Sequence, residues 1–292
     1  MGEVTIQGPG QSAGEPPWQL KLFHKSIKKK EKLLLLESLL PDTTGMRILD
    51  LGCSRGTLSY LLRARGGDWV HADLDLVNLN EAMALLGTNV VRLGQTLPFK
   101  DSAFDCVVSL DYIEHLEDDS ACLDELHRVL APGGLLILST PITGRPFLLN
   151  RLKNVLGMTP DVYGHKREGY TIAELDQRLR AARFTVERRS TYARFFTELV
   201  ELAINVAFTK IMSRRRRSGP ARQARDGHIS PGSGRELQSH AKAFKLYSLI
   251  YPFTWSVSRL DKVIPFVKGY ATILVARKQA GDLAGSQPAP EA

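Results

Sequence analysis

The sequence predicts an α/β fold in which helices cover both faces of a mostly parallel, doubly wound sheet. Apolar segments of strand length alternate with helical patterns from residue 46 onward, an arrangement typical of such folds. The first of these segments, Arg47-Ile48-Leu49-Asp50-Leu51, runs through a glycine-containing turn directly into a helical pattern. Such a turn lets the backbone approach a ligand closely and presents helix N–H groups to it.

Each predicted element has a local reason. Helix 28–40 places leucines on one face and stops at Pro41. Thr171-Ile172-Ala173-Glu174 is a capping box that starts a helix, and the turn Pro132-Gly133-Gly134 precedes a strand. The expected strands are 46–51, 69–74, 89–93, 105–110, 135–140, 184–192 and 269–278, and the other expected helices are 57–63, 79–86, 121–130, 171–182 and 195–212.

The chain divides into segments of different composition. Residues 1–17 are polar and rich in Gly and Pro, without the apolar stretch of a signal peptide, and we expect them to be disordered. The same is expected of the polar tail, 279–292. The remaining segments are a basic N-terminal helix in 18–44, a core domain in 45–193, a helical insertion in 194–268 and the last core strand in 269–278.

Basic residues are concentrated in two segments of this chain of 292 residues, whose formal net charge is +8. Residues 20–33 carry six lysines against one glutamate, and residues 208–228 carry seven basic residues against one aspartate. Such patches favour phosphates on nucleic acid or anionic lipid, although a charge run is often only a solvated face. The three cysteines lack C-x-x-C spacing, which predicts reduced thiols in a cytoplasmic protein.

The insertion is unusually long, because about 75 residues separate the last two expected strands. Helix 195–212 is apolar nearly all round, except for a narrow polar stripe. A basic cluster and a second apolar, aromatic segment, 244–255, follow it. The stripe consists of Thr197, Glu201, Asn205 and Thr209, and the cluster of Arg214, Arg215, Arg216 and Arg217. Two interpretations stay open: an interfacial membrane anchor, or a lid that packs on the core.

The turn after the first strand narrows the choice of ligand. It lacks the Gly-Lys-Ser/Thr ending of a P-loop, and Ser54 stands where a dinucleotide site has its second glycine. Asp73 ends the next strand at a spacing where a carboxylate reaches ribose hydroxyls. Gly52, Ser54 and Gly56 also match the nucleophile elbow of serine hydrolases, but His228 is poorly placed as its base, as is His240.

Further motifs follow the turn in a fixed order: His71-Ala72-Asp73-Leu74-Asp75, Leu97-Pro98-Phe99, Phe104-Asp105-Cys106-Val107-Val108, Glu114-His115-Leu116 and Leu130-Ala131-Pro132-Gly133-Gly134. Together with the turn, they resemble the class I S-adenosylmethionine-dependent methyltransferases, most closely the small-molecule type with LPF and EHL signatures. The resemblance spans residues 48–134. It implies a Rossmann-like, doubly wound seven-stranded sheet with an antiparallel last strand and a helical insertion before that strand.

The resemblance implies S-adenosyl-L-methionine as the cofactor and assigns its surroundings. The residues around the methionine part would be Asp50, Gly52, Cys53, Ser54 and Gly56. Asp73 would hold the ribose, whereas the adenine would be flanked by Leu74, Gln95, Thr96 and Leu97, and the methyl-donor side by Leu110 and Asp111. The sequence departs from the family at Ser54, which replaces a glycine, and before the LPF loop, where Arg92, Leu93 and Gly94 replace a frequent acidic residue.

Methyl transfer needs a general base only when the acceptor is a hydroxyl or an acidic carbon. The catalytic candidates are His115, His165 and Tyr170. In similar enzymes the region around His165 closes over the acceptor; the alternative is an exposed loop histidine. For His115 the alternative is a structural hydrogen bond. We expect no metal site.

These observations predict a methyltransferase that acts on a small-molecule or lipid-linked acceptor. We expect it in the cytoplasm and at the inner face of the membrane, with the Arg214–Arg217 cluster on anionic lipid. An RNA methyltransferase is less favoured, because Leu110-Asp111-Tyr112-Ile113 differs from the Asn/Asp-Pro-Pro-Tyr/Phe motif that binds a base amine. A non-catalytic scaffold with this fold is the third hypothesis, suggested by the two departures from the family.

Overall fold

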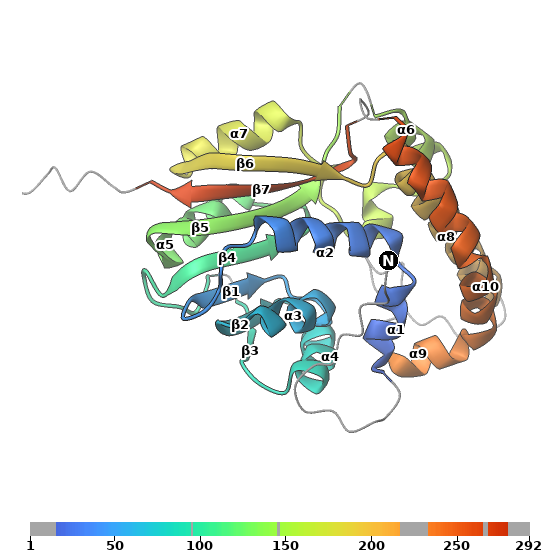
Figure 1. Ribbon diagram of the computed structural model, residues 1–292, viewed down its shortest axis with the longest axis horizontal. Coiled ribbons are helices and arrows are strands. Elements are labelled where there is room, and N and C mark those ends of the chain that lie inside the picture. Colours follow the sequence, from blue (N-terminus) through green and yellow to red (C-terminus); the bar gives the residue numbers. More distant parts are fainter. Residues whose placement is uncertain (1–15, 95, 145–146, 217–232, 265–267, 280–292) are drawn as a thin grey trace, which may run out of the picture.

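The computed structural model describes residues 16–94, 96–144, 147–216, 233–264 and 268–279, with the backbone alone for 210–216. Within these residues, seven strands form a sheet in the order β3-β2-β1-β4-β5-β7-β6 (Figure 1). Strands β1 to β5 pair in parallel, whereas β7 lies antiparallel between β5 and β6. The predicted doubly wound sheet with an antiparallel last strand is therefore confirmed.

The strands are β1 (Arg47–Leu51), β2 (Asp68–Asp73), β3 (Val90–Arg92), β4 (Phe104–Leu110), β5 (Leu130–Pro141), β6 (Phe184–Tyr192) and β7 (Ala271–Lys278). One expectation was wrong: Pro132-Gly133-Gly134 is no turn before a strand but part of β5. The pairing of β5 with β4 is irregular there, since Phe104 pairs with Leu130 and Cys106 with Leu135. Residues 131–134 of β5 therefore lie opposite the single residue Asp105 of β4. Gly133, at a φ of +73°, lets β5 accommodate these residues as a bulge.

The helices are α1 (Trp18–His24), α2 (Ile27–Leu39), α3 (Thr57–Leu62), α4 (Leu76–Leu86), α5 (Asp119–Val129), α6 (Leu148–Val155), α7 (Ile172–Ala181), α8 (Phe195–Arg216), α9 (Gly234–Ser239) and α10 (Ala241–Ser258). Short 3₁₀ turns are η1 (Arg63–Arg65), η2 (Ile113–His115), η3 (Pro160–Tyr163) and η4 (Arg259–Lys262). Segment 18–44 thus holds two helices, because Ser26 starts α2 by accepting a hydrogen bond from the Lys29 N–H.

Strand side chains alternate between two cores, one on each face of the sheet. Leu49 and Leu51 of β1 lie in a core with α5 and α7, whereas Ile48 lies in a second core with α2 and α3. Burying one such leucine or isoleucine side chain is worth about 1.5–3 kcal/mol. Asp50 points to the same side as Ile48 but sits at the carboxyl end of the strand, so the alternation that fills the cores also places a carboxylate beside the turn.

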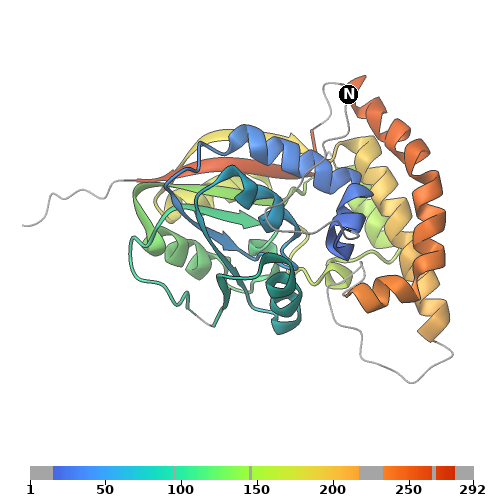
Figure 2. The same ribbon diagram turned by 60° about the horizontal axis from the view of Figure 1, so that its bottom comes forward.

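The insertion lies beyond one end of the sheet, where α8 and α10 run side by side (Figures 1 and 2). Its two ends are tied together, because Asp261 of η4 accepts hydrogen bonds of 2.8 Å from the N–H groups of Phe196 and Thr197 in α8. The carboxylate therefore caps the N-terminus of α8. None of the described helices combines the length and apolar character needed to cross a membrane.

Candidate active site

The turn between β1 and α3 has three residues in the left-handed region: Gly52 (φ +78°), Ser54 (φ +50°) and Gly56 (φ +75°). A Cβ on Gly56 would lie 3.2 Å from the Cα of Ala82, so the glycine permits close packing of α3 on α4. The Ser54 N–H donates a hydrogen bond of 2.8 Å to Oδ2 of Asp73. The turn is thus fixed to the carboxyl end of β2.

Gly52 is covered by an aromatic ring from the neighbouring strand end. A Cβ added to Gly52 would lie 2.5 Å from Cδ2 of Tyr112, which follows β4. The bare glycine backbone therefore lets the Tyr112 ring rest directly on the turn. The carboxyl ends of β1 and β4 meet at this point, as they do at the ligand-binding edge of doubly wound sheets.

The two carboxylates predicted near the cofactor have different surroundings. Asp50 is buried, where it accepts a hydrogen bond from the Ser59 hydroxyl and lies 3.1 Å from Nδ1 of His71. Asp73 is also buried, and burial raises its pKa although the N–H groups of Ser54 and Asp75 donate to it. Asp73 is thus oriented by backbone donors, whereas Asp50 is occupied by side chains.

The loop predicted to flank adenine is held by Arg128 of α5. The Arg128 guanidinium donates to the carbonyl oxygens of Leu97 (3.1 Å) and Phe99 (2.8 Å). The Leu97 N–H donates to Glu125, which also pairs with Arg128. Thr96 is exposed, and Gln95 lies outside the described residues.

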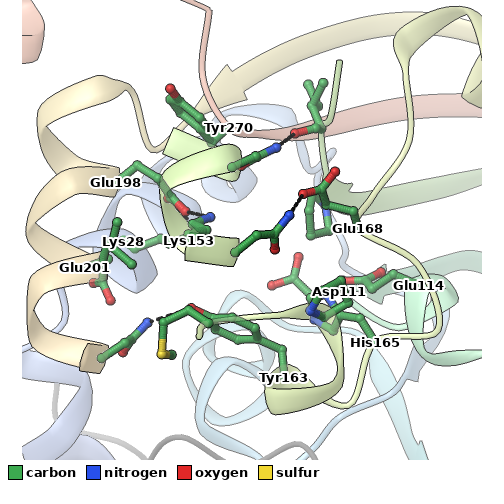
Figure 3. Close-up of a pocket in the computed structure, with 18 of the residues that line it drawn as sticks. Lys28, Asp111, Glu114, Lys153, Tyr163, His165, Glu168, Glu198, Glu201 and Tyr270 are labelled. Carbon is green, nitrogen blue, oxygen red and sulfur yellow. Dashed lines mark hydrogen bonds and ion pairs between the residues drawn. The ribbon is translucent and has the colours of Figure 1, made fainter. Parts of the chain in front are cut away.

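A cavity of about 260 Å³ lies between α2, α6, α8 and the loops that follow β4 and η3 (Figure 3). Glu198 and Glu201 face it from α8, and Asp111, Glu114 and His165 lie on the opposite side. Its charged and titratable lining residues are Lys28, Lys29, Lys32, Asp111, Glu114, Lys153, Tyr163, His165, Glu168, Glu198, Glu201 and Tyr270. The lining therefore suits a polar acceptor.

Asp111 forms the centre of a partly buried polar network. The Lys32 ammonium pairs with Oδ2 of Asp111, and the Ser139 hydroxyl donates 2.8 Å to Oδ1. The same hydroxyl lies 3.1 Å from the hydroxyl of Tyr192. Burial by itself would raise the pKa of Asp111, but Lys32 outweighs burial and holds that pKa well below its usual range. Asp111 is therefore a charged group in the cavity.

Glu198 brings two lysines from other helices to the opposite side of the cavity. Its carboxylate accepts from Lys28 at 3.1 Å and from Lys153. Burial would raise the pKa of Glu198, but the two ammonium groups outweigh it and hold the pKa below its usual value. Helices α2, α6 and α8 are joined by this carboxylate.

Glu114, His115 and His165 bring ligand-type atoms within 4.8 Å of one another, the one such group in the part of the chain that the structure describes. Glu114 is fully buried: Thr140 donates to Oε2, whereas Oε1 has no hydrogen-bond partner among the described residues. Burial, followed by the nearby Asp111, raises the pKa of Glu114 to about 8. The group's geometry would accommodate a cation or a polar atom of a substrate.

His115 and His165 touch edge to face, with ring centroids 4.7 Å apart. Nδ1 of His115 lies 2.9 Å from the Gly164 carbonyl oxygen, so this nitrogen carries a proton and Nε2 is left as an acceptor. Burial and the neighbouring His115 lower the pKa of His165 to about 4. The His165 ring is therefore neutral near pH 7, and of the two histidines it is the one that lines the cavity.

Tyr170 lies apart from these groups. Its side chain is buried in the core, and its hydroxyl donates 2.6 Å to Asp119. It is not among the residues that line the cavity, so we leave Tyr170 out of the proposed catalytic groups.

Sequence reasoning missed the lysines of α2 and α6 and their partner Glu198 as parts of the site. One signal was available: Glu201 and Asn205 belong to the polar stripe of an otherwise apolar helix, and both now line the cavity. Polar residues at such spacing mark the face that meets a polar surface. Helix α8 therefore lines the cavity with its polar stripe.

Comparison with known proteins shows which domain family the region around the turn belongs to. The model of a methyltransferase domain family matches residues 49–138, the stretch that holds the turn, Asp73, the LPF loop and Asp111. This region is a class I methyltransferase domain. Its fold and motif order agree, and the family implies S-adenosylmethionine as the cofactor.

Curated relatives of the methyltransferase domain include two O-methyltransferases. A ubiquinone biosynthesis O-methyltransferase of Psychrobacter arcticus is 34% identical over 107 residues, covering 33% of this chain and 41% of the relative. A malonyl-[acyl-carrier protein] O-methyltransferase of Erwinia billingiae is 37% identical over 98 residues, covering 33% and 39%. The chain thus spans about two fifths of the length of these relatives.

A solved structure from Bacillus halodurans, described as a candidate methyltransferase, shares the fold over most of this chain. It superposes with a TM-score of 0.54 at 18% identity and covers 85% of this chain and 98% of its own. The similarity therefore extends over the sheet and the covering helices, beyond the matched motifs.

The methyltransferase domain has a hydrogen-bond acceptor and an apolar surface that suit S-adenosylmethionine. Asp73 offers a carboxylate held in place by two backbone N–H groups, and the adjoining Leu74 is exposed, as an apolar surface for a base would be. Ser54 and Gly56 turn the backbone toward the same place. A ribose diol and an adenine ring would be held by these residues.

Proposed function

We propose that this chain transfers a methyl group from S-adenosylmethionine to an oxygen of a polar small-molecule or lipid-linked acceptor. One observation carries the proposal: Asp111 lines the cavity, and the next residue, Tyr112, rests on Gly52 of the cofactor turn. The end of β4 thus joins the place for the cofactor to the place for the acceptor. The names of the two curated relatives, both O-methyltransferases, support an oxygen as the methylated atom.

S-adenosylmethionine, when bound, supplies a methyl group on a positively charged sulfur. Methyl transfer removes that charge, so holding the acceptor in line and away from water contributes most of the rate. Asp111 and Glu114 lie on one side of the cavity, and Lys28 of α2 and Lys153 of α6 lie on the other (Figure 3). His165, neutral near pH 7, is placed to accept the proton of an acceptor hydroxyl.

A lipid-linked acceptor would be met at the cytoplasmic face of a membrane. The arginines expected to bind anionic lipid do not contribute to this proposal, because Arg217 and the side chains of Arg214–Arg216 lie outside the described residues. RNA is disfavoured as the acceptor. Three lysines of the cavity lining, Lys28, Lys32 and Lys153, are paired with Glu198 or Asp111, so these cations are engaged within the cavity and do not offer a free basic surface to a phosphate backbone.

The test is transfer of labelled methyl from S-adenosylmethionine into whole-cell lipid, RNA and polar-metabolite fractions. We expect label in the lipid or the metabolite fraction, and less label with the Asp73→Ala variant at a limiting concentration of S-adenosylmethionine. Label confined to RNA would overturn the choice of acceptor. Calorimetry with S-adenosylhomocysteine distinguishes the enzyme from a non-catalytic scaffold, because a scaffold that binds no cofactor would show no binding even at millimolar ligand.

A further inference from the structure

Helix α10 presents a stripe of apolar side chains to solvent. Leu246, Leu249, Ile250 and Phe253 are 63%, 77%, 46% and 72% exposed, and the exposed Leu260 follows in η4. Steps of three and four residues place the first four on one side of α10. A contiguous apolar stripe of this kind on a protein surface marks an interaction site.

The stripe cannot turn inward, because the opposite face of α10 is fixed to α2. The Tyr247 hydroxyl donates 2.5 Å to the Lys25 carbonyl oxygen, and the Lys30 ammonium donates 3.1 Å to the Tyr251 hydroxyl. The Lys25 ammonium also lies 4.9 Å from the centroid of the Tyr251 ring. Orientation of the exposed face is therefore set by the fold.

The charged residues around the stripe are mostly basic. Segment 241–264 contains four cationic residues, Lys242, Lys245, Arg259 and Lys262. Its one acidic residue, Asp261, is buried as the cap of α8. The Arg259 guanidinium lies 4.3 Å from the ring centroid of Trp255, which follows Tyr251 by four residues on the face turned away from the stripe. Leucine and phenylalanine bordered by cations are typical of a helix lying in a membrane interface.

We propose that α10 docks flat on an anionic lipid bilayer, with Leu246, Leu249, Ile250, Phe253 and Leu260 inserted among the lipids. An 18-residue helix is about 27 Å long, so it lies along the surface rather than across it. Helix α8, which packs on α10, carries Glu198 and Glu201 of the cavity. The inference rests on the proposed function for its consequence: if the acceptor is lipid-linked, docking of α10 would hold the cavity next to it.

Flotation of the full chain with vesicles tests the docking. We expect binding to vesicles of phosphatidylcholine and phosphatidylglycerol, and weaker binding to phosphatidylcholine alone. Leu249→Ser together with Phe253→Ser is expected to weaken binding about tenfold or more. Lys242→Glu with Lys245→Glu is expected to remove the preference for anionic vesicles. The matched control, Leu148→Ser with Val155→Ser, alters the exposed apolar residues of α6 and should leave binding unchanged.

Equal binding by all variants, or no vesicle binding by the unaltered chain, would overturn the proposal. A dimer in light scattering that dissociates in the α10 variant, without vesicle binding, would assign the stripe to a second copy of the chain instead. S-adenosylhomocysteine binding is measured in parallel by calorimetry. Its persistence in every variant shows that loss of docking is separate from loss of the proposed function, and its absence in the unaltered chain would reject that function alone.

Discussion

The ammonium group of Lys32 is paired with the carboxylate of Asp111, and this partly buried pair joins α2 to the end of β4. Helix α2 lies outside the region that matches the methyltransferase family, residues 49–138. The charge on Asp111 at the cavity therefore depends on a residue that precedes the family domain. Helix α2 is thus a part of the active site as well as a cover for the sheet.

Replacing Lys32 by Met should leave the partly buried Asp111 carboxylate without its cation. Losing a hydrogen bond to a charged group costs about 1.5–3 kcal/mol, so we expect a fall of about 2 kcal/mol in the free energy of unfolding. Urea unfolding at pH 7 measures this change in the free energy of unfolding. Lys100→Met, at an exposed position, is the control. Adding Asp111→Asn to Lys32→Met should recover part of the loss, and a single-variant loss below about 1 kcal/mol would contradict the argument.

Substitution of Ser54 is expected to change cofactor affinity little, whereas substitution of Asp73 is expected to lower it strongly. Ser54 contacts Asp73 through its backbone N–H, which Ser54→Gly keeps, and glycine tolerates the φ of +50° better. We expect the affinity for S-adenosylhomocysteine to change less than about threefold in Ser54→Gly. Asp73→Ala should lower it about tenfold or more, since the loss of a charged acceptor costs about 1.5–3 kcal/mol. Calorimetry decides: a large loss in Ser54→Gly would show that the hydroxyl itself is a contact.

The strands and the turn were predictable because their causes are local. The alternation of Ile48 and Leu49, the glycines at 52 and 56 and the capping box at Thr171 act over a few residues, and the structure confirms the elements that they predict. Short helices are harder: α6 has only eight residues, too few for a clear period.

The cavity was not predictable, because its contacts join distant segments. Lys28 and Glu198 are 170 residues apart in the chain and 3.1 Å apart in space. Tyr170 shows the reverse case. As a titratable residue close to His165 it was a reasonable candidate, but burial against Asp119 is a tertiary property that a single sequence does not contain. Likewise, the aromatic composition of α10 was visible, whereas the side that faces solvent was not.

Glu114 should make stability depend on pH between about 4.5 and 8. Its pKa is raised to about 8 in the folded chain, whereas an unfolded glutamate titrates near about 4.3. Over this window the folded state holds a proton that the unfolded state has lost, so the free energy of unfolding falls as pH rises. Glu114→Gln removes this dependence, because an amide mimics the neutral acid.

Urea unfolding at pH 5, 6, 7 and 8 measures this effect. We expect Glu114→Gln to gain stability relative to the unaltered chain at each step upward. Glu117→Gln, at an exposed position three residues away, should show a constant difference. A pH-independent difference for Glu114→Gln would mean that the carboxyl is already ionised at pH 5.

Replacing His165 by Asn should reduce kcat for methyl transfer about 100-fold while leaving S-adenosylhomocysteine affinity unchanged, because the general base is lost and the cofactor turn is not touched. The assay is label transfer into whichever cell fraction accepts the label from S-adenosylmethionine. His24→Asn, at an exposed position, is the control. With a pKa of about 4, His165 stays neutral from pH 6 to 8, so His165 should cause no rise in kcat near pH 6.5. EDTA should leave the rate unchanged. A rate that EDTA abolishes and divalent cations restore would instead mean that Glu114, His115 and His165 hold a metal ion.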